Sequence, residues 1–261
     1  MSEAAKLAAP FGVVRSFSGR RWRLEEPNEV LARRLQGELQ LSPTLARLLT
    51  ARGIALGEEP DYLHPTLRKL LPDPLVLCEM EVAIQRVKKA LESGERIAVL
   101  GDYDVDGSAS AALLHGFFAG LGAPPRIYIP DRMREGYGPS PAAIEVLHGE
   151  GAKLVITVDC GAAGGAAFAR ARDLGLDMVV LDHHRVEARP AAFAHVNPNQ
   201  PGDRSGLTYL CAAGVTFLFL VGLNRALREQ GFYGDRALVQ PDLRRHLDLV
   251  ALATICDVVP L

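Results

Sequence analysis

Short apolar segments alternate with helical segments from about residue 77 onward, and this alternation limits the fold more than any other feature of the sequence. Strands that alternate with helices form a parallel sheet, which the helices cover on both faces. We therefore expect an α/β domain built on a parallel β-sheet with helices on both faces. The expected strands are residues 96–100, 126–129, 153–158 and 178–181, and the expected helices are residues 80–93, 108–121, 141–150, 163–174, 208–230 and 241–255.

Residues 1–75 differ from the rest of the chain in pattern, with arginine-rich stretches and short apolar groups, and are predicted to be a mainly helical N-terminal extension. A catalytic domain of residues 76–261, ending in long helices, is expected to follow. Helices are expected at 28–36 and 43–52. Ser42 is a typical N-cap, and Pro43 suits the first helical position. The extension is rich in arginine, whose side chains could contact phosphates or solvent. These arginines are Arg20, Arg21, Arg23, Arg33 and Arg34.

The composition is that of a globular protein, with 48% hydrophobic and 23% charged residues. The longest apolar runs fall well short of the roughly 20 residues that span a bilayer. The first residues lack the hydrophobic stretch of a secretory signal, so we expect a cytoplasmic protein with no membrane segment. The four cysteines have no zinc-site spacing, which favours buried free thiols.

A formal net charge of −2 gives the chain no general basic surface for nucleic acid. Metal-binding carboxylates lower this count, however, and bound divalent cations would reverse the local sign where a phosphate approaches. The charge therefore does not exclude a nucleic-acid substrate.

Acidic residues follow three of the expected strands. The first strand leads into Asp102, Asp104 and Asp106, the third into Asp159, and the fourth into Asp182-His183-His184. Ligands bind parallel sheets outside the carboxyl ends of the strands. Carboxylates gathered there repel one another unless a cation neutralises them, and none of these tips contains lysine or arginine.

A metal site accounts for this pattern. Aspartate and histidine ligands suit Mn²⁺ or Mg²⁺, with Mn²⁺ preferred, and the number of carboxylates favours two ions of the kind that promote phosphoryl displacement. Two alternatives remain beside it. Residues 102–107 match the start of an EF-hand loop, although Leu113 stands where a glutamate is required. Asp182 could instead cap a helix, with the histidines as loop residues.

Other catalytic patterns are weak or missing. The remaining histidines lie outside the acidic strand ends and are interpreted as surface or packing residues, and the sequence has no dinucleotide-binding, P-loop or serine-elbow motif. The other histidines are His64, His115, His148, His195 and His246.

The strings GDYDVDG, VDCG and DHH, in this order, resemble the DHH phosphoesterase superfamily. The strings LCAAGVTFLF, NPN, DRMREGYG and LVALATICDVVPL resemble its RecJ branch, whose members are single-strand-specific 5′→3′ DNA exonucleases. This resemblance covers nearly the whole chain.

The resemblance implies a role for each matching residue. Asp104 and Asp106 would each bind one metal ion, Asp159 would bridge the two, and His183 and Asp257 would complete the second site. Of the residues with predicted catalytic roles, His184 would touch the scissile phosphate, Asp182 would orient its neighbours, and Asp102 has a less defined part. The candidate substrate-binding residues are Arg132, Tyr137 and Asn197.

The implied activity is metal-assisted release of mononucleotides from the 5′ end of single-stranded DNA, in DNA repair and recombination. Single-strand-binding protein and a recombination helicase are the implied partners, and a monomer is expected. Two alternatives stay open: a nanoRNase, cyclic-dinucleotide phosphodiesterase or pyrophosphatase of the same superfamily, and a non-catalytic replication scaffold. Relatives continue into a second domain, whereas this sequence stops at Leu261, so we expect a fragment that is weakly active or inactive alone.

Overall fold

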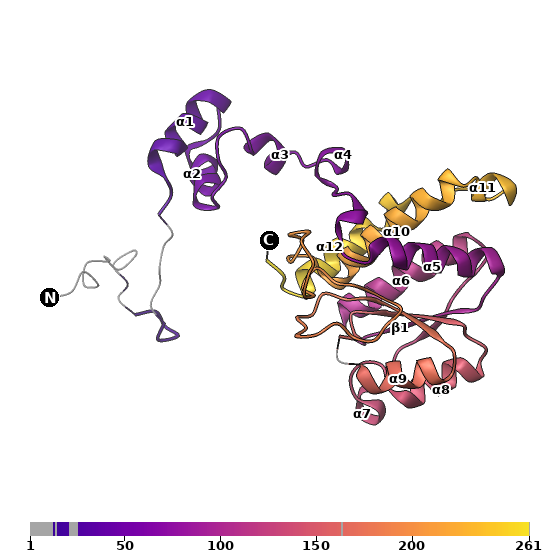
Figure 1. The fold of residues 1–261 in the computed structure, drawn as a ribbon. Helices are drawn as coiled ribbons and strands as arrows, with labels where there is room; N and C mark the ends of the chain where they lie inside the picture. Colours follow the sequence, from indigo (N-terminus) through magenta and orange to yellow (C-terminus); the bar gives the residue numbers. More distant parts are fainter. Residues whose placement is uncertain (1–12, 14, 21–25, 163, 261) are drawn as a thin grey trace. The chain divides into compact units, whose positions relative to one another are not determined.

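The chain forms two compact units, Met1–Leu71 and Pro72–Leu261, in a computed structural model that describes residues 13, 15–20, 26–162 and 164–260 (Figure 1). Arg21 and Arg23 lie outside the described residues. The functional division predicted after residue 75 stays a prediction. Within the described part of the chain, no helix is both long enough and apolar enough to cross a membrane.

The first unit is mainly helical, as predicted. Its helices pack through a small apolar cluster centred on Leu35 and Leu49. The Ser42 side chain accepts a hydrogen bond from the Leu45 N–H at 3.3 Å, which confirms Ser42 as an N-cap. The helices are α1 (Glu29–Leu39), α2 (Pro43–Ala51), α3 (Glu59–Leu63) and α4 (Leu67–Leu70).

The second unit is built on a five-stranded parallel sheet in the order β2-β1-β3-β4-β5, which confirms the predicted α/β fold. Every residue of β1 and β3 is buried, as expected for strands covered on both faces. The strands are β1 (Ile97–Gly101), β2 (Arg126–Tyr128), β3 (Leu154–Val158), β4 (Asp177–Leu181) and β5 (Ala194–Val196).

Strand β5 was not predicted. It has only three residues and ends directly before the turn-rich sequence NPNQPGDRSG, so it carries no readable strand pattern. Its position comes from pairing with β4, where Val196 lies beside Leu181. The carboxyl end of β5 therefore lies beside the carboxyl end of β4.

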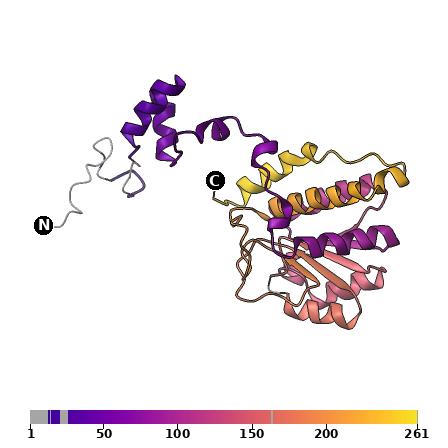
Figure 2. The same cartoon turned by 45° about the horizontal axis from the view of Figure 1, so that its top comes forward.

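Helices cover both faces of the sheet (Figure 1). One face carries α5 (Met80–Ser93), α6 (Val105–Gly120) and α10 (Ala212–Glu229); the other carries α8 (Pro141–Gly149) and α9 (Gly165–Asp173). Helix α12 (Leu247–Cys256) packs on α6 and α10 rather than on the sheet, as Figure 2 shows.

Several helix boundaries differ from the prediction. Helix α6 begins at Val105 rather than residue 108, because the Asp104 side chain caps it. Helices α10 and α12 begin later than residues 208 and 241, and a 3₁₀ turn, η4 (Leu243–His246), precedes α12. The short elements η3 (Pro74–Val76), α7 (Arg132–Glu135) and α11 (Phe232–Asp235) were not predicted.

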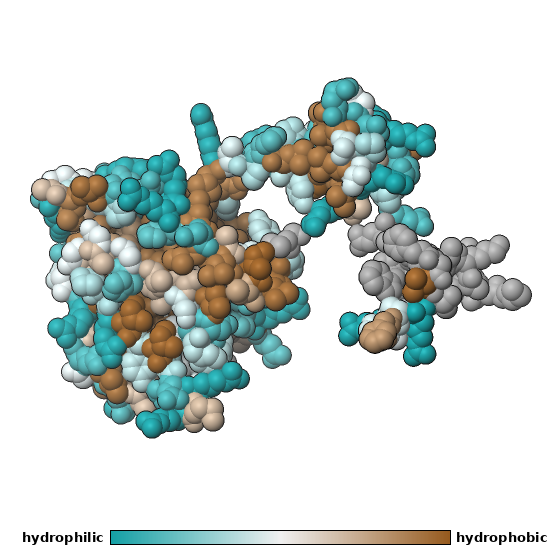
Figure 3. Space-filling model, turned by 180° about the vertical axis from the view of Figure 1, so that it is seen from behind, coloured by the Kyte–Doolittle hydropathy of each residue, from teal (hydrophilic) through white to brown (hydrophobic). Residues whose placement is uncertain are grey.

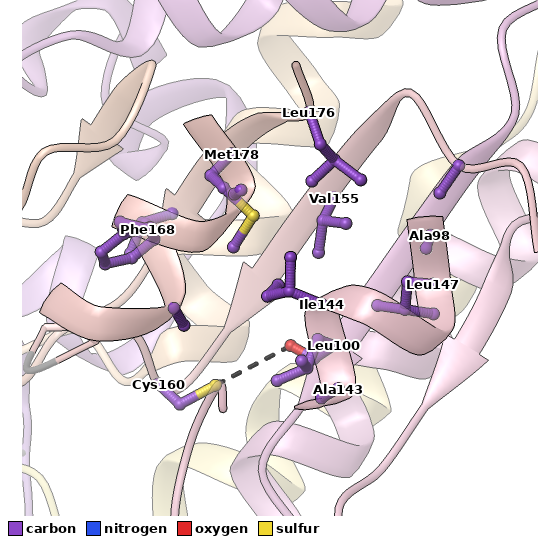
Figure 4. Packing of buried hydrophobic residues seen from close by; sticks show 14 residues of the cluster. Ala98, Leu100, Ala143, Ile144, Leu147, Val155, Cys160, Phe168, Leu176 and Met178 are labelled. Atoms are coloured by element: carbon purple, nitrogen blue, oxygen red, sulfur yellow. Dashed lines mark hydrogen bonds between the residues drawn. The ribbon is translucent and has the colours of Figure 1, made fainter. Parts of the chain in front are cut away.

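The core between the sheet and helices α8 and α9 is a continuous apolar cluster (Figure 4). The Cys160 thiol lies in it and donates to the Leu100 carbonyl at 3.8 Å. All four cysteines are free, as predicted, but only Cys160 and Cys211 are buried, and Cys256 is exposed. Figure 3 shows that hydrophobic side chains also reach the surface of each unit among hydrophilic ones.

Candidate metal centre

The strand order reverses direction between β1 and β3, because the chain runs from β1 to β2 on one side and later places β3 on the other. The helices that follow β1 and β3, α6 and α9, lie on opposite faces of the sheet. The loops after these two strands therefore diverge at the carboxyl edge of the sheet, which is the usual ligand position in open α/β sheets.

The segment after β1 brings three carboxylates to this edge. Asp102 is buried and accepts from the Tyr103 N–H at 2.8 Å. Asp104 caps α6 by accepting from the Gly107 N–H at 3.0 Å. Asp106, in the first turn of α6, is 1% exposed.

Both carboxylate oxygens of Asp106 accept hydrogen bonds from the start of α10. The Ala212 and Ala213 N–H groups donate to them at 2.6 and 2.7 Å. These N–H groups have no partner within α10, and the positive end of the helix favours a carboxylate there. Helix α10 therefore fixes Asp106 at the carboxyl edge of the sheet.

Asp159 follows β3 with a left-handed backbone, at φ 58°. Its N–H donates to the Leu181 carbonyl at 3.1 Å, and its own carbonyl accepts from the Tyr137 hydroxyl at 3.1 Å. A non-glycine residue in this conformation is uncommon, and these two bonds hold it. The side chain is 2% exposed.

The segment after β4 carries Asp182, His183 and His184. Asp182 is fully buried and accepts from the Ala162, His183 and His184 N–H groups, and its Oδ1 lies 2.8 Å from His184 Nδ1. No helix begins here, so the alternative interpretation of Asp182 as a helix cap is wrong. Its bonds orient the two histidines that follow it.

His183 lies at the meeting point of the three strand ends and of α12. Its Nε2 is 3.4 Å from Asp159 Oδ1, 3.5 Å from Asp257 Oδ2 and 3.7 Å from Asp106 Oδ2. Asp257 is the C-cap of α12, far along the chain from the acidic strand ends, and only the family resemblance pointed to it.

Three overlapping groups of these side chains have potential ligand atoms within 4.8 Å of one another. Asp159 belongs to two of the groups and His183 belongs to two, so these two residues join the three groups into one cluster. The groups are Asp106, His183 and Asp257; Asp102, Asp104 and Asp159; and Asp159, His183 and His184.

The electrostatics of the cluster favour a cation. Burial, together with the carboxylates of Asp106 and Asp104, raises the pKa of Asp159 to about 10. Burial also raises the pKa of Asp102 and that of Asp106. These carboxylates can be ionised together near neutral pH only beside a compensating positive charge.

Two buried atoms of the cluster also lack hydrogen-bond partners among the described residues. They are Asp159 Oδ1 and His183 Nε2, which lie 3.4 Å apart. A buried polar atom without a partner is costly, whereas a divalent ion would bind both atoms at once. The donor set, hard oxygens with imidazole, fits Mn²⁺ or Mg²⁺.

Aromatic and basic groups lie beside the cluster. The Arg132 guanidinium lies 5.0 Å from the centre of the Tyr103 ring, in a cation–π contact that sequence reasoning missed. The Tyr137 and His184 rings meet edge-on, with their centroids 6.3 Å apart, and Tyr137 is 54% exposed. Arg132 lies in the short helix α7, which was not predicted from the sequence.

The candidate substrate-binding residue Asn197 does not reach solvent in this structure, and its role stays a prediction. Its side chain is fully buried, and its amide donates to the His184 carbonyl at 2.8 Å. Asn199, which the prediction did not name, donates to the His183 carbonyl at 2.6 Å. Both asparagines belong to the NPN string that the sequence analysis noted. Because strand β5 was not predicted, however, their position beside the two histidines could not be inferred. His195 is buried beside them, as the packing interpretation expected.

A parallel α/β unit with carboxylates and histidines gathered at its topological switch point defines a candidate divalent-metal centre. Comparison with known proteins identifies the family. Residues 96–254, more than half of the chain, match the model of the DHH family, N-terminal domain. The chain belongs to the DHH family.

Curated relatives agree with the family assignment. The chain is 38% identical over 224 residues to the single-stranded-DNA-specific exonuclease RecJ of Escherichia coli, covering 85% of this chain and 38% of that protein. It is 34% identical over 242 residues to the RecJ of Thermus thermophilus, covering 92% of this chain and 33% of that protein. The chain thus spans about two fifths or less of the length of these relatives.

Solved structures share the fold. The chain superposes on the RecJ of Thermus thermophilus in complex with Mn²⁺ with a TM-score of 0.71 and 31% identity, covering 92% of this chain and 32% of that one. It superposes on an exonuclease RecJ bound to manganese with a TM-score of 0.60 and 34% identity, covering 71% of this chain and 44% of that one. The chain also superposes on the RecJ of Thermus thermophilus in complex with Mg²⁺, with a TM-score of 0.58 and 28% identity, covering 92% of this chain and 29% of that one.

Proposed function

We propose that this chain carries the catalytic centre of a metal-dependent exonuclease that releases mononucleotides from the 5′ end of single-stranded DNA in repair and recombination. The observation that carries the proposal is the pair of buried, unbonded atoms Asp159 Oδ1 and His183 Nε2 inside a ring of carboxylates. The names of the relatives supply the substrate class.

Two divalent ions, with Mn²⁺ preferred and Mg²⁺ possible, fit the cluster. Asp106, His183 and Asp257 would hold one ion, Asp104 and Asp102 would hold the other, and Asp159 would serve both. When bound, such ions lower the pKa of water and stabilise charge on a phosphoryl group and its leaving oxygen.

His184 is suited to contact the phosphate. The hydrogen bond to Asp182 raises the pKa of the His184 imidazole, so the ring holds its Nδ1 proton and can carry a positive charge. Its side chain is 46% exposed, in contrast to the buried Asp182. A charged, partly exposed ring beside the cluster can donate to a phosphate oxygen.

Arg132 and Tyr137 are suited to hold the nucleotide. Arg132 rests on the Tyr103 ring and forms no ion pair with a carboxylate among the described residues, so its guanidinium is available to a phosphate. The Tyr137 hydroxyl is engaged with the Asp159 carbonyl, which leaves the exposed ring for stacking on a base.

The test compares hydrolysis of a 5′-phosphorylated single-stranded oligonucleotide and of a dinucleotide, with Mn²⁺, by wild type, Asp159→Asn and Asp173→Asn. Asp173 is an exposed carboxylate at the end of α9 and serves as the matched control. We expect shortening of the oligonucleotide from its 5′ end, a loss of about 100-fold or more in Asp159→Asn, and no loss in Asp173→Asn.

Other outcomes contradict the proposal. Faster cleavage of the dinucleotide would support a nanoRNase-type or cyclic-dinucleotide phosphodiesterase instead. Absence of Mn²⁺ binding by calorimetry would support the non-catalytic scaffold. Variants are compared within the same chain. A cytoplasmic location, a monomeric state and partnership with single-strand-binding protein and a recombination helicase stay predictions.

A further inference from the structure

The peptide groups of His183 and His184 are hydrogen-bonded on both sides. On one side, the N–H groups of both histidines donate to Asp182 Oδ1, at 2.7 and 3.1 Å. On the other, the His183 carbonyl accepts from Asn199 Nδ2 at 2.6 Å, and the His184 carbonyl accepts from Asn197 Nδ2 at 2.8 Å. Every polar backbone atom of the two histidines therefore has a side-chain partner.

The two asparagines lie in a turn that is itself tightly held. The Asn199 N–H donates to Asn197 Oδ1 at 2.7 Å, and the Gln200 N–H donates to the Asn197 carbonyl at 3.1 Å. Gln200 Nε2 donates in turn to the His195 carbonyl at 2.6 Å, at the middle of β5. The turn is thus joined to β5, which pairs with β4 and keeps the asparagines beside the histidines.

We propose that Asn199 and Asn197 are positioning residues that set the orientation of His183 and His184, an inference that rests on the proposed metal-dependent function. His183 Nε2 lies between 3.4 and 3.7 Å from oxygens of three carboxylates. A small rotation of the His183 peptide would carry the ring away from all three. Residues that orient metal ligands in this way typically change metal affinity about 10- to 100-fold when removed.

The two asparagines bind different histidines. Asn199 acts on His183, a proposed metal ligand, and makes this single side-chain bond. Asn197 acts on His184, the proposed phosphate contact, and also accepts from the Asn199 N–H. Removing the Asn197 side chain would therefore disturb both histidines, so Asn199 gives the cleaner test.

The experiment measures Mn²⁺ affinity by calorimetry for wild type, Asn199→Ala, Asn199→Asp and Asn224→Ala. Asn224 is the matched control, because it is an asparagine of α10 whose buried Oδ1 accepts from the Tyr233 hydroxyl at 2.5 Å, outside the metal cluster. We expect Mn²⁺ affinity to fall about 10-fold or more in both Asn199 variants. Asn224→Ala is expected to lower the melting temperature and leave Mn²⁺ affinity unchanged.

Asn199→Asp keeps the size of the side chain but replaces the donating NH₂ with oxygen, so it carries the test even if Asn199→Ala does not fold. An Mn²⁺ affinity within about twofold of wild type in a folded Asn199 variant would overturn the inference. A fall in affinity in Asn224→Ala as large as in Asn199→Ala would also overturn it, because stability alone would then explain the loss. If wild type binds no Mn²⁺, the proposed function fails, and this inference fails with it.

Discussion

Gly107 offers a direct test of the turn that carries the first three carboxylates. A Cβ atom at position 107 would lie 2.6 Å from the Asp102 carbonyl oxygen and 2.7 Å from the Asp102 nitrogen. These neighbours are backbone atoms, which cannot move aside like the end of a flexible side chain. The Gly107 N–H also donates to Asp104 Oδ1, so a shift of the turn would weaken the cap of α6.

The expected cost of Gly107→Ala follows from these contacts. Forcing an extra methyl group into a packed site costs about 1–3 kcal/mol, and loss of an N-cap costs about 1 kcal/mol. We expect the free energy of unfolding to fall by about 3 kcal/mol. In a unit of this size that corresponds to a fall in melting temperature of about 6–12 °C.

Urea unfolding and calorimetry of Gly107→Ala and Gly149→Ala measure this effect. Gly149 ends α8, and an added Cβ there would meet nothing within 4 Å. Because alanine is the better helix former, Gly149→Ala is expected to be neutral or stabilising by up to about 1 kcal/mol. A loss below about 1 kcal/mol in Gly107→Ala would refute the close approach of Asp102 and Gly107.

Three further substitutions test other parts of the fold. Tyr137→Phe removes the hydroxyl that donates to the Asp159 carbonyl, and should cost about 1 kcal/mol in thermal unfolding. Arg86→Met removes a buried guanidinium that lies 2.6 Å from the carboxylates of both Glu95 and Asp177. It should lower the free energy of unfolding in urea by about 2 kcal/mol, which is less than for a fully buried ion pair because both carboxylates are partly exposed. Although burial opposes the shift, Arg189 lowers the pKa of Glu79 below 4.5. The free energy of unfolding of wild type should therefore exceed that of Glu79→Gln by its largest amount at neutral pH, and this difference should shrink as the pH falls below 4.5. Unfolding measured at pH about 7 and at pH about 4 tests this.

Most of the sheet could be predicted from the sequence because its strands are buried on both faces. Segments such as Leu154–Val158 are continuously apolar and are bounded by helical patterns. The acidic strand ends could be predicted for the same reason, since parallel strands place their carboxyl ends along one edge. Once the strands are placed, the closeness of Asp106 and Asp159 follows.

Other features depended on tertiary contacts that leave no local pattern. Strand β5 forms because it pairs with β4. With only three residues, it is too short to show an alternating pattern of apolar and polar residues in the sequence. The burial of Asn197 could not be predicted, because the sequence of a buried amide that binds a backbone carbonyl looks like that of an exposed loop residue. Likewise, the start of α10 depends on Asp106, which lies far away in the chain and accepts from its first N–H groups.

Asp257 differs from the other carboxylates in its local energetics. Asp104 and Asp106 lie at the beginnings of helices, where the free N–H groups favour negative charge whatever their function. Asp257 lies at the C-terminal end of α12, where the helix carbonyls disfavour it. Its carboxylate also lies 3.5 Å from His183 Nε2, beside other carboxylates that are buried. A residue placed against its local electrostatic preference requires a compensating interaction elsewhere, and a divalent ion held together with His183 and Asp106 would supply one. The position that local sequence reasoning could not recognise is therefore the one whose placement argues most directly for the metal.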